Sequence, residues 1–84
     1  MKVEPDSMKA AINRLKRAQG QLNAVVRMLE EGQDCKAIIT QLSAVSSAVD
    51  KAGFSIIATN LQQCLANPEL GDVAELEKMF LSLA

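Results

Sequence analysis

Two cysteines, Cys35 and Cys64, are the residues of this 84-residue chain best suited to chemistry. The chain contains no histidine, which excludes histidine-based acid-base catalysis and histidine metal ligands. It also lacks a nucleophile-base pair and a phosphate-binding glycine loop, so we expect a protein that is not an enzyme. Any chemistry must therefore depend on the two thiols or on carboxylates.

The elements that position the cysteines are predicted to be helices only. Apolar residues recur with helical spacing, and no segment shows the alternation of a strand. We predict an all-α fold in which residues 1–84 form a single domain. The helices are expected at about residues 7–31, 35–65 and 72–83.

Helix-boundary residues separate these three segments. Pro5 to Ser7 supply a start for the first helix, and Gly32 supplies a stop. Asp34 is a suitable N-cap for the second helix, which Asn67 and Pro68 end. The expected subunit is a long antiparallel hairpin with a short third helix.

The predicted second helix is apolar around most of its circumference. Such a helix must be covered on several sides, and one partner helix within the chain cannot do this. We therefore expect two chains to associate, with their hairpins forming a four-helix bundle.

Cys35 and Cys64 share one face of this helix but lie at its opposite ends. They are 29 positions apart, or about 43 Å on an unbroken helix, whereas disulfide-linked Cα atoms lie roughly 5.5 Å apart. The two thiols of one chain therefore cannot meet. An antiparallel neighbour would place Cys35 of one subunit beside Cys64 of the other, giving two equivalent dithiol sites per dimer.

The surroundings of the two cysteines predict an order of reaction. Cys35 lies in the first turn, where the helix dipole stabilises a thiolate; Lys36 adds positive charge and Asp34 opposes it. Cys64 lies in the last turn, where the dipole disfavours a thiolate. We expect Cys35 to attack first and Cys64 to resolve. The alternative is that both cysteines only fill apolar space.

Metal binding by these residues is a weaker expectation. Two thiolates suit Cu(I) but leave a Zn²⁺ site half filled. Asn60, one turn before Cys64, has an amide that binds soft metals poorly. We expect no resident cofactor.

Charge is distributed unevenly, although the net charge is only −1. From Ser7 to Leu29 every charged residue is basic, which suggests an anionic partner, although such a run is often only a solvated helix face. With no leader and no run of about 18 apolar residues, we expect a cytoplasmic protein without a membrane role. Thiols stay reduced in that compartment.

Four sequence elements together resemble the CsoR/RcnR family of small all-helical bacterial transcriptional repressors. They are RLKRAQGQ at Arg14–Gln21, DC at Asp34–Cys35, ITQL at Ile39–Leu42 and NLQQC at Asn60–Cys64. Members are dimers of dimers that bind operator DNA through basic residues of their first two helices. The resemblance implies this role for Arg14 and Arg17, assisted by further lysines. These are Lys9, Lys16, Lys36 and Lys51.

The resemblance also bears on the inducer. Copper-sensing members bind Cu(I) with cysteines at the places of Cys35 and Cys64 and a histidine at the place of Asn60. This chain resembles more closely the CstR branch, in which persulfides or polysulfides link the two cysteines across the dimer and release the DNA. The alternatives are a Cu(I)-responsive repressor that uses the two thiolates alone and a helical interaction module with no DNA role.

Overall fold

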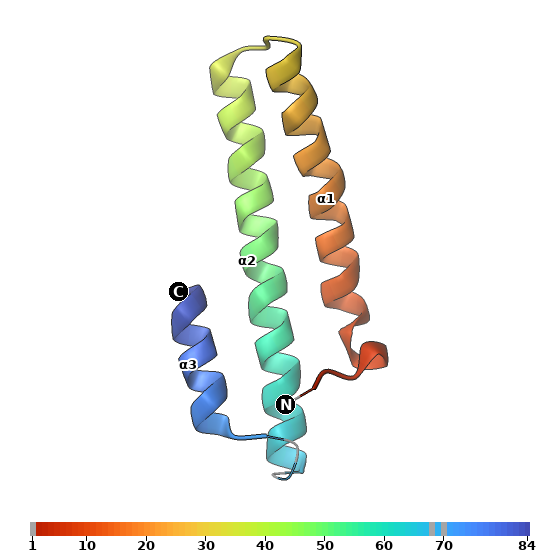
Figure 1. Ribbon diagram of the computed structural model, residues 1–84, viewed down its shortest axis with the longest axis vertical. Helices are drawn as coiled ribbons and strands as arrows, with labels where there is room; N and C mark the ends of the chain where they lie inside the picture. The colour runs from red at the N-terminus through yellow and green to blue at the C-terminus, as the bar shows by residue number, and fades with distance from the viewer. Residues whose placement is uncertain (1, 68, 70) are drawn as a thin grey trace.

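The computed structural model describes residues 2–67, 69 and 71–84 of the chain. A short 3₁₀ helix, Pro5–Met8, is followed by α1 (Lys9–Glu30), α2 (Cys35–Ala66) and α3 (Val73–Leu83). Figure 1 shows α1 and α2 as an antiparallel hairpin, with α3 folded back along α2 on the side away from α1. No strand occurs in the described ranges, and the prediction of an all-α, three-helix chain is confirmed.

The three helices form a single layer. The chain extends over 52 × 25 × 13 Å, and the smallest of these dimensions is about one helix diameter. Both broad faces of the layer are therefore open, and neither is covered by another element of the described chain.

The turn between α1 and α2 is a Schellman motif centred on Gly32. Gly32 has a φ of 67°, a left-handed conformation that favours glycine. Its backbone N–H donates to the carbonyl of Leu29, and the N–H of Gln33 donates to that of Met28, at 3.1 and 3.0 Å. Gly32 thus ends α1 as the sequence predicts.

The first helix starts differently from its expected form. Residues Pro5–Met8 adopt a 3₁₀ turn, so the α-helix begins at Lys9, and no side chain caps it. Ser7 Oγ instead donates to the carbonyl of Glu4 and accepts a bond from Gln63 Nε2 at 3.0 Å. Ser7 thus ties the N-terminal turn to the end of α2.

Aspartates cap the other two helices. Asp34 accepts a bond from the N–H of Ala37 at the start of α2, and Asp72 accepts one from the N–H of Ala74 at the start of α3. At its other end, α2 reaches Ala66. Pro68, expected to help end this helix, lies outside the described residues.

The seam between α1 and α2 uses buried residues spaced seven apart on each helix. They are Ala11, Ala18 and Val25 on α1, and Ile38, Val45 and Ala52 on α2. The regular spacing keeps both series on the seam along the hairpin. Val25, Ile38 and Val45 form one core cluster, against which Met28 packs.

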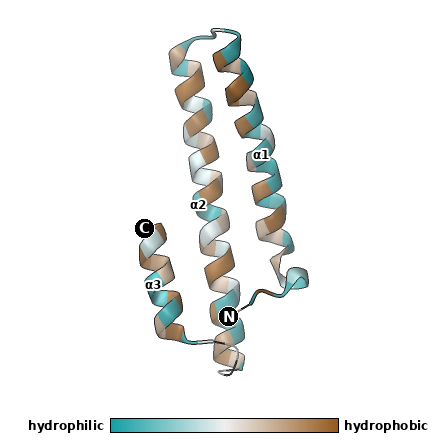
Figure 2. Cartoon of the chain, in the orientation of Figure 1, coloured by the Kyte–Doolittle hydropathy of each residue, from teal (hydrophilic) through white to brown (hydrophobic). Residues whose placement is uncertain are grey.

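Large apolar side chains lie beside this seam rather than within it. Leu22 and Val49 are 46% and 45% exposed, and Leu15, Val26 and Leu42 are exposed too. Figure 2 shows hydrophobic residues recurring along the whole length of α1 and α2. This exposure agrees with the expectation that a second chain covers the hairpin, and that assembly stays a prediction.

The third helix packs against the C-terminal half of α2 through apolar contacts. Leu76 is only 2% exposed, and the rings of Phe54 and Phe80 are 5.3 Å apart. Near the end of α3, Leu83 lies so close to Gly53 that a Cβ there would be 2.8 Å from Leu83 Cδ1. Gly53 therefore permits the close approach of α3.

Candidate nucleic-acid interface and thiol sites

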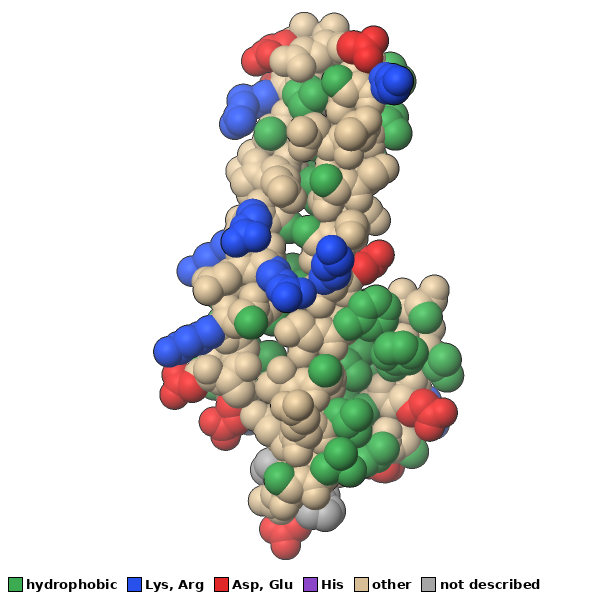
Figure 3. Space-filling view, turned by 180° about the vertical axis from the view of Figure 1, so that it is seen from behind, with side chains coloured by type: hydrophobic (Ala, Val, Ile, Leu, Met, Phe, Trp, Pro, Cys, Tyr) green, Lys and Arg blue, Asp and Glu red, His purple; other side chains and the backbone are tan. Residues whose placement is uncertain are grey.

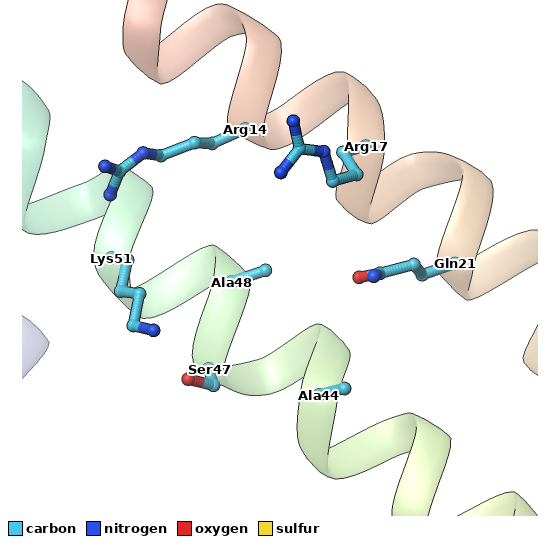
Figure 4. A pocket seen from close by; sticks show the side chains of 7 residues that line it. All are labelled: Arg14, Arg17, Gln21, Ala44, Ser47, Ala48 and Lys51. Carbon is cyan, nitrogen blue, oxygen red and sulfur yellow. The ribbon is translucent and has the colours of Figure 1, made fainter.

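A hollow lined by three basic side chains lies between α1 and α2 near the middle of the hairpin. Arg14 and Arg17 come from α1 and Lys51 comes from α2. The remaining described lining residues are Gln21, Ala44, Ser47 and Ala48. We call these seven residues the basic hollow (Figure 4).

Helical spacing explains why these residues meet. Arg14, Arg17 and Gln21 are at positions i, i+3 and i+7 of α1, so they share one side of it. Ala48 and Lys51 are likewise neighbours on one side of α2. Because small residues form the α2 side, little bulk stands between the cations, and none of the described lining residues is acidic. The site can therefore accept an anion.

Figure 3 shows the same feature on the molecular surface. Lysine and arginine side chains gather across the middle of this face, over α1 and α2. Cationic side chains that gather on one face bind phosphate groups through charge and hydrogen bonds. The arrangement thus fits the nucleic-acid role expected for Arg14, Arg17 and Lys51.

The other lysines expected at the DNA do not line the hollow. Lys9 and Lys16 are exposed on α1, at positions that face away from the seam. Lys36 is exposed near the opposite end of α2, beside the hairpin turn. The hollow therefore gathers three of the six expected residues, and the roles of all six stay predictions.

Gln21 belongs to the hollow and had no role assigned from sequence. Its side-chain Oε1 is buried and accepts no hydrogen bond from any described group. Its spacing, seven residues after Arg14 and four after Arg17, places it on the same side of α1, and this was the sequence feature that could have indicated its place in the hollow. A buried acceptor without a donor is unfavourable, so this amide is suited to a donor brought by a ligand.

Cys35 is the first residue of α2 and is exposed. Asp34 caps the helix next to it, and Lys36 follows it on the exposed surface. The thiol is therefore accessible at a helix N-terminus, where the unpaired backbone amides favour negative charge. These surroundings suit a thiol that reacts early.

Cys64 lies in a different environment at the other end of α2. It is buried, with 3% of its surface exposed, and it lines an open hollow where α3 begins. Asn60, one turn earlier, is also buried, and its Oδ1 accepts no bond from any described group. The structure thus places Asn60 and Cys64 together and Cys35 far from both.

The continuous α2 keeps the thiols apart, and both cysteines are free. No group of three or more cysteine, aspartate or glutamate side chains that could hold a metal occurs in the described residues. A single chain therefore offers one thiol at each end of α2. Shared chemistry between the two thiols requires two chains.

Comparisons with known proteins identify the family. A family model described as metal-sensitive transcriptional repressor matches residues 7–82. The chain belongs to this family. The resemblance to the CsoR/RcnR repressors is thereby confirmed, while the narrower placement in the CstR branch stays a prediction. No solved structure was found to match the chain significantly.

Similar proteins come from mycobacteria and from Bacillus subtilis. The chain is 39% identical over 61 residues to the copper-sensing transcriptional repressor CsoR of Mycobacterium ulcerans, covering 73% of this chain and 52% of that protein. It is 36% identical over 52 residues to the copper-sensing repressor RicR of Mycobacterium tuberculosis, covering 62% and 54%. It is 45% identical over 38 residues to the uncharacterized YrkD of Bacillus subtilis, covering 45% and 60%.

The chain spans about half the length of the mycobacterial repressors it matches. Within residues 2–67, 69 and 71–84, no helix combines the length and hydrophobicity needed to cross a bilayer.

Proposed function

We propose that this protein is a transcriptional repressor that binds operator DNA through the basic hollow. The observation that carries the proposal is the convergence of Arg14, Arg17 and Lys51 from two helices onto one face without an acidic neighbour in the lining. Membership of a repressor family supports it. Neutralisation of phosphates by these cations makes the binding salt-dependent.

Two chains pair through the exposed apolar side of the hairpin in this proposal. Leu15, Leu22 and Val49 line a hollow on that side, and burying it would cover side chains that the single layer leaves exposed. An antiparallel arrangement of the two α2 helices brings Cys35 of one chain to Cys64 of the other. A pair of such dimers would present two or more basic hollows to one duplex.

The proposed inducer is a reactive sulfur species such as a hydropersulfide, as in the CstR branch. The Cys35 thiolate attacks the outer sulfur of R–S–S–H, the S–S bond breaks, and RS⁻ leaves with its electron pair. Cys35 then carries a persulfide. The Cys64 thiolate of the other chain attacks the Cys35 sulfur, forming the bridge and releasing HS⁻. A longer sulfur chain on Cys35 gives a trisulfide or tetrasulfide in the same way.

Bridging would release the DNA by holding the helix ends in a new arrangement. The link at each end of α2 favours one state of the dimer, and the basic hollows of that state no longer match the spacing of the phosphates. The exposed position of Cys35 supports its role as the first thiol to react.

An operator gel shift combined with intact-mass analysis tests this function. We expect the reduced protein to bind its operator, and polysulfide treatment to produce an interchain bridge and abolish the shift. Cys35→Ser should bind DNA and ignore polysulfide. DNA binding that persists in a fully bridged protein, or treatment that yields no bridge, would contradict the sulfur-sensing proposal.

A Cu(I)-responsive repressor is the second candidate, because the names of the mycobacterial relatives describe copper sensing. The thiolates of Cys35 and Cys64 from different chains would hold Cu(I), a soft ion that thiolate ligands select. Stoichiometric Cu(I) that releases the DNA would favour this candidate. Asn60→His should raise the Cu(I) affinity by adding an imidazole beside Cys64, which equilibrium competition with a Cu(I) chelator measures.

A further inference from the structure

The cations of the basic hollow lie on one broad face of the hairpin. On α1, at about 100° per residue, Arg14 and Arg17 are displaced about 40° and 100° to one side of the buried seam residue Ala18. The apolar residues Leu15 and Leu22 are displaced about 60° and 40° to the other side. Figure 3 shows the cations gathered across one face. The first helix thus separates charge from exposed apolar surface.

The second helix repeats this division. Ala48 and Lys51 of the basic hollow are displaced about 60° and 120° from the seam residue Val45, toward the side of the cations. Val49 and the two cysteines are displaced about 40° to 100° toward the opposite side. The broad face opposite the basic hollow therefore carries both the exposed apolar residues and the thiols.

Pairing of two chains through this apolar face fixes where the cations go. The proposed sulfur link sets Cys35 of one chain beside Cys64 of the other, so the two-fold axis of the pair crosses α2 halfway between these positions, next to Val49. Val49 is exposed on the apolar face at this point. The basic hollow, which includes Lys51, lies at the same height on the opposite side of α2. The hollows of two paired chains are therefore back to back and open outward.

One duplex cannot serve two hollows that open in opposite directions. Two stacked layers, each about one helix diameter thick, measure roughly 20 Å across. The persistence length of DNA is about 150 base pairs, so a turn of about 180° around the edge of the bundle is strongly unfavourable. A second duplex needs no bending to reach the second hollow. Repulsion between the two duplexes is screened, since the Debye length is about 8 Å at physiological ionic strength.

We infer that the assembled protein has two outward DNA-binding faces and holds two duplexes at once, one on each face, so that it bridges separate DNA segments. The inference rests on the proposed function, from which it takes operator binding and the pairing of Cys35 with Cys64. It adds a second activity, DNA bridging, that follows from the opposition of the basic and apolar faces.

A bead assay with the reduced full-length protein tests DNA bridging. Biotinylated operator DNA is held on streptavidin beads, and a fluorescent operator fragment is free in solution. We expect limiting protein to carry the fluorescent fragment onto the beads. Arg14→Ala with Arg17→Ala should abolish this transfer, and Arg27→Ala, on the outward side of α1, should leave it unchanged.

Native mass spectrometry with excess operator duplex counts the duplexes directly. We expect complexes in which one protein assembly holds two duplexes. The Kd for the second duplex should be about fourfold that for the first, the statistical factor for two equal sites whose charges are screened from each other.

A cross-linking variant tests the back-to-back arrangement. Val49→Cys, in a chain that also carries Cys35→Ser and Cys64→Ser, places two thiols at the two-fold axis. Diamide should take up their two hydrogens and leave an interchain disulfide, and the linked pair should still bridge DNA. Ser43→Cys in the same background is the matched control, because Ser43 is exposed, faces away from the seam and lies further from the axis. It should not form the link.

Three outcomes would overturn the inference. The first is an assembly that binds operator in a gel shift but never holds more than one duplex. The second is fluorescent DNA that stays in solution while the protein occupies the beads. The third is Val49→Cys that cross-links no better than Ser43→Cys. All three leave operator binding intact, whereas loss of operator binding itself would contradict the proposed function, so the two failures are distinguishable.

Discussion

The two broad faces of the α1–α2 hairpin differ although they flank the same seam. One face carries the basic hollow, with Arg14, Arg17 and Lys51. The other carries an apolar hollow that includes Leu22 and Val49. Because both helices lie in one layer, residues a few positions apart in sequence serve opposite faces.

This difference shows how a short chain can divide two tasks. The buried seam is narrow and includes two alanines on α1, so few large side chains are buried between the two helices of the hairpin. The large apolar residues are left exposed and available for the proposed contact with another chain, and the cations are left available for the proposed anionic ligand. Variants on either face should therefore separate assembly from ligand binding.

The largest effect is expected on the apolar face. Leu22→Glu places a charge where another chain is proposed to pack, and burying an unpaired charge is strongly unfavourable. Sedimentation velocity should show monomers in place of oligomers, and operator binding should be lost with them. The control is Asn23→Glu, an exposed site that faces away from the seam and lines neither hollow. Assembly that survives Leu22→Glu would place the interface elsewhere.

The next effect concerns the basic face. Removing both arginines with Arg14→Ala and Arg17→Ala should weaken operator binding roughly 100-fold, at about 1.5 kcal/mol for each charge-assisted contact. The slope of log affinity against log salt should fall by about two units. Arg27→Ala, on the outward side of α1, is the matched control. If Arg27→Ala weakens binding equally, the hollow is not the DNA site.

A smaller effect is expected where α3 joins the apolar side of α2. Gly53→Ala would bring a Cβ to 2.8 Å from Leu83 Cδ1, so the end of α3 must shift. We expect a loss of about 1 kcal/mol in the free energy of unfolding, measured by urea denaturation. Gly20→Ala meets open space and should stabilise α1 by up to about 1 kcal/mol. Equal effects of the two substitutions would mean that α3 does not dock as described.

An effect of similar size but opposite sign on stability is expected at Gln21, within the basic hollow. Gln21→Met removes the buried Oε1 that has no donor, which should raise the free energy of unfolding by about 1 kcal/mol. If a DNA group donates to this oxygen, operator affinity should fall by roughly threefold to tenfold. Thermal melts and gel shifts of the same variant measure both quantities. Unchanged affinity would limit Gln21 to a structural role.

The sequence predicted the helices well and the packing of their side chains less well. Gly32 and Asp34 mark boundaries through local backbone chemistry, which is why the hairpin turn was predictable. Apolar residues recur with helical spacing along the sequence, yet the buried positions of α1 include Ala11 and Ala18, whereas the larger Leu22 is exposed. Hydrophobic periodicity identifies the apolar side of a helix, but it does not tell which apolar residues pack against the neighbouring helix of the same chain and which stay exposed.

For the candidate sites too, features that depend on local structure were predictable from the sequence, whereas features that depend on packing were not. Spacing alone predicted that the thiols of one chain are far apart, because this follows from the rise of a continuous helix. The gathering of Lys51 with Arg14 and Arg17 depends on the register between α1 and α2, which no local signal fixes. Likewise, the burial of Cys64 depends on how the chain folds back at α3, a long-range contact that single-sequence patterns do not encode.

The unbroken length of α2 has a mechanical consequence. Lys51 lies 13 residues from Cys64 and 16 from Cys35, or about 20 and 24 Å along the axis. A helix of this kind resists bending over such distances far more than a loop does. In the proposed switch, strain applied by a covalent link at one end would therefore reach the middle as rotation or tilt of the whole helix, and the orientation of Lys51 would change without local unfolding.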